Sequence, residues 1–86
     1  MLGKQHQSQH YREAEGEYPL GNRLKVARAE RGLSQEQLAG LVGVTRQTIS
    51  AVETGLYCPS ALLAFLLANQ LEKPVDELFF LKGETP

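Results

Sequence analysis

The middle of the chain carries apolar residues at helical spacing. Leu24 and Ala27, with the aliphatic stem of Arg28, occupy positions i, i+3 and i+4 and therefore share one face of a helix. Asn22 precedes this stripe as a candidate N-cap, and Gly32 supplies the left-handed residue that ends many helices. The pattern predicts a first helix between these two residues.

A second helix is predicted from Ser34 to Gly43. Ser34 and Gln37 have the spacing of a capping box, in which each side chain satisfies the other residue's backbone N–H. Gly43 supplies the left-handed end of the helix. The apolar stripe expected on this helix consists of Leu38, Leu41 and Val42.

A third helix follows closely, with Thr45 as its cap and Gly55 as its end. The residues expected to face inward are Ile49 and Val52. Because Gly43, Val44 and Thr45 form the whole connection, the third helix must leave the second at a steep angle. That angle requires a small residue at the crossing and a glycine at the turn, which Ala39 and Gly43 provide.

The remaining apolar residues predict two C-terminal helices. A fourth helix is expected from its cap, Ser60, to about Leu71, and a short fifth helix follows Pro74, whose missing N–H has no intrahelical partner in a first turn. The core positions of the fourth helix are Leu63, Ala64, Leu67, Ala68 and Leu71. No alternating strand pattern is present, so the expected class is all-α, with five helices.

The first part of the chain differs from the rest. Residues 1–19 are rich in Gln, His and Glu and have no sustained hydrophobic period, so we expect an arm without a packed core. The folded domain is predicted to span residues 20–82, with residues 83–86 as a C-terminal tail. A chain of this length buries only about 60% of its unfolded surface, which suits one small core.

Cysteine usage and hydropathy indicate the compartment. The single cysteine, Cys58, has no partner for an intramolecular disulfide, and a small secreted domain normally relies on several. No segment approaches the roughly 18 consecutive apolar residues of a membrane span, and the N-terminus lacks the apolar region of a signal peptide. We therefore expect a cytoplasmic protein. Cys58 is expected to be a half-buried loop residue, with redox sensing as the alternative.

The net charge of −1 argues against an anionic partner, but the charge is unevenly distributed. In residues 21–57 five basic side chains stand against three glutamates, whereas both flanking segments are net negative. Positive charge therefore gathers in the middle of the chain.

Residues for catalysis or metal binding are scarce. The sequence has no Ser/His/Asp arrangement, paired-carboxylate site or phosphate-cradling glycine loop, so neither an enzyme nor a cofactor is expected. His6 and His10 are four residues apart and would ligate a metal only on a helix. No Cys or further His accompanies them, so no metal site is predicted. No pocket for a small-molecule effector is evident either.

The segment LSQEQLAGLVGVTRQTISAVETG strongly resembles the helix-turn-helix of the Cro-like (XRE) family of prokaryotic and phage DNA-binding regulators. The residues that carry the likeness are Ser34-Gln35, Ala39, Gly43, the run from Thr45 to Ser50, and Glu53 with Gly55. The likeness extends from Asn22 to Leu81. It implies a compact lambda-repressor-like domain of five helices, with the helix-turn-helix at residues 34–54.

The resemblance implies that the third helix enters the major groove with its N-terminal residues toward the base edges. The residues at those positions are Arg46, Gln47, Ser50 and Ala51. Arg46 suits guanine O6 and N7, Gln47 suits adenine N6 and N7, and Ala51 suits a thymine methyl. The alternative for these residues is an ordinary solvated helix face.

Contacts that position the domain on the DNA backbone are expected from groups near helix ends. Gln35 lies in the first turn of the second helix, where backbone N–H groups and the helix dipole favour a phosphate. The candidates for phosphate contact are Gln35, Thr45, Thr48, Thr54, Tyr57 and Arg23. Thr45 is a cap in either case, and half burial under the fourth helix is the alternative for Tyr57.

Two charged residues are separated from the DNA-binding set. The resemblance implies that Arg28 of the first helix and Glu53 at the end of the third form an ion pair. Both are therefore interpreted as structural residues.

The fourth helix is apolar on both sides. Its outward side and the residues after the fifth helix, including Phe79, carry more apolar surface than a small domain can bury, which indicates an interface. The residues expected in a homodimer interface are Leu62, Phe65, Leu66, Phe80 and Leu81. The alternative is that the N-terminal arm covers this surface with Tyr11, Tyr18 and Leu20.

The predicted function is a sequence-specific transcriptional regulator that binds double-stranded DNA. A repressor that recognises a palindromic operator as a homodimer is the leading form of this hypothesis. The alternatives are an antitoxin or other reader domain that acts through a partner protein, and a helix-turn-helix used only for protein contact.

Overall fold

A computed structural model of the chain describes residues 20–83. The predicted class is confirmed, because the described part is mostly helical and contains five helices. In chain order the elements are β1 (Leu20–Asn22), α2 (Leu24–Glu30), α3 (Gln35–Val42), α4 (Arg46–Thr54), α5 (Ala61–Leu71), α6 (Val75–Leu78) and β2 (Phe79–Leu81). Residues 1–19, for which an unpacked arm and a cover over the apolar surface are predicted, lie outside the described residues.

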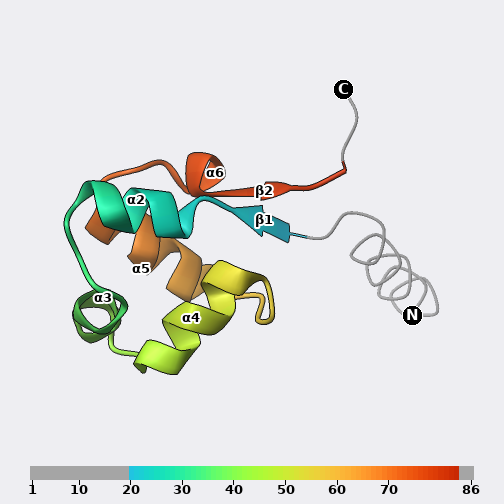
Figure 1. Cartoon of the computed structure of the whole chain (residues 1–86). Helices are drawn as coiled ribbons and strands as arrows, with labels where there is room; N and C mark the ends of the chain where they lie inside the picture. Colours follow the sequence, from blue (N-terminus) through green and yellow to red (C-terminus); the bar gives the residue numbers. More distant parts are fainter. Residues whose placement is uncertain (1–19, 84–86) are drawn as a thin grey trace.

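The two strands are an addition to the predicted fold. They pair in antiparallel register, with Leu20 opposite Leu81, Gly21 opposite Phe80 and Asn22 opposite Phe79. This short ribbon extends away from the helices on one side of the domain (Figure 1). A strand of three residues is too short to show an alternating pattern, and its partner lies at the far end of the domain sequence. The sequence therefore carried no readable signal for it.

The core lies where α2, α3, α4 and α5 meet, with α6 closing one side (Figure 1). Its buried residues are Leu24, Ala27, Leu38, Ala39, Ile49, Val52, Leu63, Leu67, Ala68, Leu71, Leu78 and Phe79. The inward faces predicted for the first and third helices are therefore correct. Leu41 was predicted to be buried and is exposed, because no described element covers the outer side of α3, where Leu41 lines a shallow hollow with Leu33 and Gly40.

The predicted N-caps are largely confirmed. Ser34 and Gln37 form a reciprocal capping box, with hydrogen bonds of 2.8 and 3.0 Å. Thr45 and Ser60 each accept a hydrogen bond from a backbone N–H in the first turn of α4 and α5, respectively. Asn22 differs from its prediction: the N-cap position is Arg23, and Asn22 acts from one residue earlier by accepting the Leu24 N–H at 3.0 Å. These caps fix where each helix begins.

The turn between α3 and α4 depends on a left-handed glycine. Gly43 has φ 79° and ψ 31°, and its N–H closes α3 by donating to the carbonyl of Ala39. In this conformation the chain reverses at once, so that Thr45 already caps α4. The two helices therefore pack directly against each other and set the direction of α4.

Substitutions at Gly43 and Gly40 are expected to change stability in opposite directions. A Cβ at either residue meets no atom within 4 Å, so only backbone conformation matters. Gly43→Ala should cost about 1–2 kcal/mol because an alanine is strained at positive φ. Gly40→Ala, inside α3, should gain about 0.5–1 kcal/mol. Thermal unfolding of both variants tests this prediction, and a loss of stability in both would contradict it.

Candidate nucleic-acid interface

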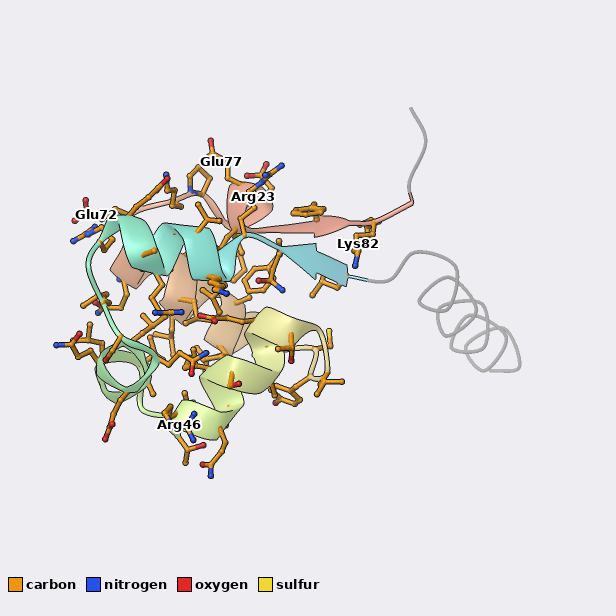
Figure 2. The ribbon with its side chains drawn as sticks, viewed as in Figure 1. Arg23, Arg46, Glu72, Glu77 and Lys82 are labelled. Atoms are coloured by element: carbon orange, nitrogen blue, oxygen red, sulfur yellow. The ribbon has the colours of Figure 1, made fainter. Side chains whose placement is uncertain are left out.

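The outer side of α4 brings together the four residues predicted to read bases. Arg46 and Gln47 are exposed in the first turn, and Ser50 and Ala51 lie half-buried one turn later. Ile49 and Val52 are buried on the opposite side and prevent α4 from rotating about its axis. In Figure 2 Arg46 lies at the outer end of α4 and points away from the core. The four side chains therefore form one surface with a fixed orientation.

The hydroxyl groups of Thr45 and Thr48 lie beside this surface. Their Oγ1 atoms are 3.1 Å apart, and Thr45 Oγ1 also accepts the Thr48 N–H at 3.2 Å. The backbone N–H groups in the first turn of a helix point out of its N-terminal end. Together with the positive end of the helix dipole, they favour an anion there. Both threonines therefore lie at the N-terminal end of α4, beside the four candidate base-reading residues.

Thr54 and Tyr57 lie at the other end of α4. The Thr54 hydroxyl donates to the carbonyls of Ser50 and Ala51, at 3.0 and 3.3 Å, and so remains close to the helix. Tyr57, in the loop after α4, is 46% exposed, so about half of it is covered and it still reaches solvent.

Gln35 is already engaged within the protein. Its Nε2 donates to Glu53 Oε1 at 3.0 Å, which leaves the second N–H of the amide for another acceptor. Gln35 begins α3, so this hydrogen bond connects the first turn of α3 to the last turn of α4. The two helices of the helix-turn-helix are thus joined at a second point, far from Gly43.

The structure does not bring Arg23 together with the other candidates. The guanidinium of Arg23 lies over the ring of Phe80, 5.2 Å from the ring centroid. Figure 2 places Arg23 near Glu77, on the side of the molecule opposite Arg46. Sequence spacing alone gave no indication of this, because β2 was not predicted.

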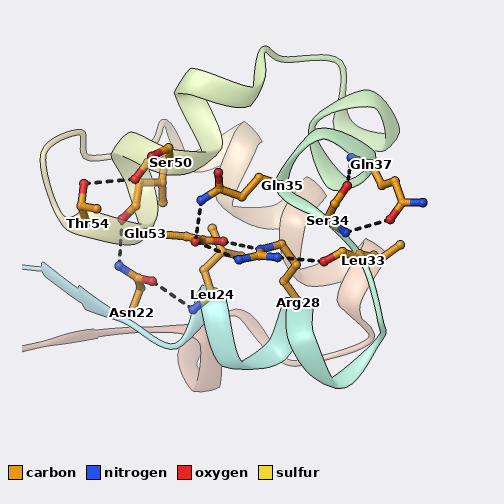
Figure 3. A network of polar contacts seen from close by, with 11 residues as sticks. Asn22, Leu24, Arg28, Leu33, Ser34, Gln35, Gln37, Ser50, Glu53 and Thr54 are labelled. Atoms are coloured by element: carbon orange, nitrogen blue, oxygen red, sulfur yellow. Dashed lines mark hydrogen bonds and ion pairs between the residues drawn. The ribbon is translucent and has the colours of Figure 1, made fainter.

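The expected ion pair between Arg28 and Glu53 is present at the centre of a larger network (Figure 3). Arg28 Nε donates to Glu53 Oε2 at 2.6 Å, and Nη2 donates to Oε1 at 3.2 Å. The third nitrogen of Arg28 donates to the carbonyl of Leu33 at 2.8 Å. Only 14% of the Arg28 side chain and 4% of the Glu53 side chain are exposed. The network connects α2, the loop before α3, and the end of α4.

The pair also sets the charge state of Arg28. The hydrogen bond to Glu53 raises the pKa of Arg28 above its ordinary value, and the negative charge of Glu53 adds to this, against the opposing effect of burial. Arg28 therefore stays protonated at every pH at which the protein is studied. It is a fixed structural cation.

The apolar residues proposed for an interface divide into two groups. On α5, Leu62, Phe65 and Leu66 are 70%, 61% and 39% exposed, as their outward position predicted. On the ribbon, Leu81 faces the same side as Leu20, whereas Phe80 lies opposite Gly21 and faces the other side. Phe80 is thus separated from Leu81 and lines a hollow with Arg23. Phe79, predicted to add to the exposed apolar surface, is instead buried.

The exposure of Cys58 differs from its prediction. Cys58 was expected to be half-buried and is exposed, because the loop between α4 and α5 lies at the surface. Within residues 20–83 no group of His, Cys, Asp or Glu side chains could hold a metal ion, and His6 and His10 lie outside that range. In the same range, no helix is long and apolar enough to cross a membrane.

Comparison with known proteins gives the family. A family model described as helix-turn-helix matches residues 24–78. An uncharacterised HTH-type transcriptional regulator of Bacillus subtilis, YgzD, is 44% identical over 65 residues, which cover 76% of this chain and 98% of that protein. An uncharacterised HTH-type transcriptional regulator of Methanothermobacter thermautotrophicus is 51% identical over 59 residues, which cover 67% of this chain and 86% of that protein.

A solved structure agrees with these relatives. The restriction-modification controller protein C.AhdI from Aeromonas hydrophila is 38% identical, with a TM-score of 0.61 over 64% of this chain and 80% of that chain. The relatives are named as transcriptional regulators, a class of DNA-binding proteins rather than of enzymes. The matched residues contain the whole of the candidate interface on α3 and α4. The chain therefore belongs to the XRE-type helix-turn-helix family of DNA-binding transcriptional regulators.

Proposed function

We propose that the protein is a cytoplasmic repressor that binds a palindromic operator as a homodimer, with α4 of each subunit in the major groove. The observation that carries this proposal is the outer face of α4, where Arg46 and Gln47 project from a helix that packing holds in one orientation. Family membership supports DNA as the ligand of that face.

Each residue on the face has a distinct role in the proposal. Arg46 donates two hydrogen bonds to guanine O6 and N7, and Gln47 makes the paired contact to adenine N6 and N7. Ala51 contacts a thymine methyl, and Ser50 adds a less specific hydrogen bond. Arg46 carries most of the specificity, since it is the one residue of the four that combines charge with a planar fork of donors.

The backbone contacts come from the two helix N-termini that flank the turn. The N–H groups in the first turns of α3 and α4 bind phosphates, with Gln35, Thr45 and Thr48 as side-chain donors. Thr54 and Tyr57 contact the opposite wall of the groove. Arg23 is not included, because it lies over Phe80 on the other side of the domain.

This interface is poor in cations. Between residues 35 and 54 the charged side chains are Glu36, Arg46 and Glu53, and Glu53 is paired with Arg28. The logarithm of DNA affinity falls with the logarithm of salt concentration in proportion to the number of phosphates that cations neutralise. We therefore expect a noticeable but modest salt dependence, with much of the affinity coming from neutral donors.

Selection of binding sites from random DNA with the purified protein tests the proposal. A palindromic motif with two half-sites about one helical turn apart is expected, because the two α4 helices of a dimer lie about that far apart. A reporter with this motif over its promoter should then lose expression when the protein is present. Enrichment of no motif would reject sequence-specific binding, and increased expression would reject repression.

The exposed side of α5 supports the homodimer. Leu62 and Phe65 place large apolar side chains in solvent, and burying them against the same residues of a second subunit removes that surface from water. Leu66, at the edge of this patch, is partly covered already. A dimer also increases the effective concentration of the second half-site contact, which offsets the low charge of each subunit.

Phe65→Asp is expected to dissociate the dimer. A charge at the centre of an apolar interface should weaken association by at least about tenfold, which sedimentation velocity at several concentrations measures. Val26→Asp is the matched control, since Val26 is 58% exposed against 61% for Phe65 but lies on α2. Loss of association in the control, or a wild-type protein that is monomeric at high micromolar concentration, would contradict the dimer.

The same apolar surface is also the one observation that favours the second candidate function. An antitoxin or recruited reader domain would bury Leu62 and Phe65 against a different protein. Such a protein would be monomeric alone in the sedimentation experiment while still selecting a DNA motif. That combination of results would favour the partner-dependent role.

A further inference from the structure

The C-terminal end of α4 is held by a residue outside the helix-turn-helix. Asn22 Nδ2 donates a hydrogen bond of 2.9 Å to the backbone carbonyl of Val52, which lies 30 residues further along the chain. The other atom of the same amide, Oδ1, accepts the N–H of Leu24 at 3.0 Å. One part-buried side chain therefore bridges the first turn of α2 and the last turn of α4 (Figure 3).

This bridge adds a second donor to a carbonyl at the C-terminal end of α4. Val52 is among the last four residues of α4, whose carbonyls have no partner in the regular helical pattern. Its carbonyl accepts the Gly55 N–H at 3.1 Å and the Asn22 amide. A donor at the negative end of the helix dipole is favourable, and so the amide is well matched to this site.

Asn22 is itself held rigidly. It pairs with Phe79 in the ribbon, and the next residue, Arg23, donates its N–H to the carbonyl of Leu78 at 2.9 Å. The backbone of Asn22 is thus fixed to the C-terminal elements of the domain. Movement of α4 away from this anchor would break the hydrogen bond to Val52.

The position of α4 depends on anchors at both ends. The turn at Gly43 fixes the N-terminal end against α3, and Asn22 together with the Arg28–Glu53 pair fixes the C-terminal end. Ser50 and Ala51, two of the proposed base-reading residues, lie within one turn of Val52. Hydrogen bonds to base edges tolerate only a few tenths of an ångström in length, so the tilt of α4 affects discrimination directly.

We infer that Asn22 is a positioning residue for base recognition: by holding the Val52 carbonyl, it sets the tilt of α4 in the major groove. This inference rests on the proposed function and adds to it a residue that does not contact DNA. Asn22 acts through α4, so its loss should reduce discrimination between operators more than it reduces general affinity for DNA.

Two substitutions separate this role from the cap on α2. Asn22→Asp retains an acceptor for the Leu24 N–H but places a carboxylate against the Val52 carbonyl and the negative end of α4. Asn22→Ser also retains a cap for Leu24, but its side chain is too short to reach Val52. Ser60→Ala is the control, because it removes the cap of α5 at Leu63 without a contact to α4.

The measurement is the dissociation constant for an operator with one base pair changed in each half-site, divided by the dissociation constant for the selected operator. Asn22→Asp and Asn22→Ser should lower this ratio by about three- to tenfold, the equivalent of one hydrogen bond. Ser60→Ala should leave it unchanged at a temperature well below its melting point, although it also lowers stability. A purely structural role for Asn22 would make all three variants behave alike.

A second measurement tests the anchor without DNA. The N–H of Gly55 shares the Val52 carbonyl, so its hydrogen exchange should accelerate in both Asn22 variants and not in Ser60→Ala. The N–H of Leu63 donates to Ser60, so its exchange should accelerate in Ser60→Ala and not in the Asn22 variants. Faster exchange at Gly55 with a lowered ratio supports the inference. If the Asn22 variants keep the wild-type ratio, the inference about Asn22 is overturned and the proposed function stands. If the wild-type protein itself does not discriminate between operators, both the proposed function and the inference are overturned.

Discussion

Arg46→Ala should weaken binding to the selected operator by about 1–3 kcal/mol per half-site, a loss of roughly 5- to 150-fold for each contact. Arg46 is exposed in the first turn of α4 and is the one cation between residues 35 and 54. Its removal therefore eliminates both a paired contact to a base and the principal positive charge of the interface. Fluorescence anisotropy with the operator and with scrambled DNA measures both effects.

Two matched variants separate specific recognition from charge. Arg46→Lys preserves the charge but not the planar fork, so it should retain binding to scrambled DNA and lose most of the preference for the operator. Arg31→Ala removes the same charge from a surface ion pair with Glu72, on the side of the molecule away from Arg46, and should have little effect. Equal losses in Arg31→Ala and Arg46→Ala would show that net charge alone drives binding. Arg46→Ala should also unfold at the wild-type temperature, since its side chain makes no core contact.

The local sequence determined the helix boundaries well. Capping and left-handed turns are decided by a few neighbouring residues, and so Ser34, Thr45, Ser60 and Gly43 could be assigned from their spacing. The inward faces of α2 and α4 followed from periodicity for the same reason. The direction in which the base-reading residues face depends only on these local features, and could therefore be predicted.

Features that depend on distant parts of the chain could not be predicted. Leu41 has the periodicity of a core residue, but no described element packs on its side of α3. Pairing of Gly21 with Phe80 turns that ring away from Leu81, and neither strand is long enough to reveal its register. The link from Asn22 to Val52 likewise requires knowledge of the tertiary fold, because an Asn before a helix is otherwise explained by capping alone.

Glu53→Gln should destabilise the domain by about 2–4 kcal/mol. Breaking a fully buried ion pair costs roughly 3–5 kcal/mol because the remaining charge is stranded, and the 14% exposure of Arg28 moderates that cost here. The amide of the new glutamine keeps one oxygen that accepts a hydrogen bond from Arg28. Its NH₂ group is a donor, and it would face two other donors, the Arg28 guanidinium and the Gln35 amide. Urea unfolding measures the change, and wild-type stability would show that the pair is not structural.

The cost of breaking the pair should not depend on pH, and a double substitution distinguishes a stranded charge from lost packing. Pairing raises the pKa of Arg28, so its contribution to stability is fully present below the ordinary pKa of an arginine and is lost only at still higher pH, above the folded-state pKa. The cost of Glu53→Gln should therefore be equal at about pH 6 and about pH 9, well below that range. Arg28→Met combined with Glu53→Met should recover most of the stability lost in Glu53→Met alone, because no charge is left unpaired. The opposite outcome is a double variant in which the free energy of unfolding lost equals the sum of the losses in the two single variants. In that case the loss comes from the hydrogen bonds to Leu33 and Gln35 that hold the start of α3.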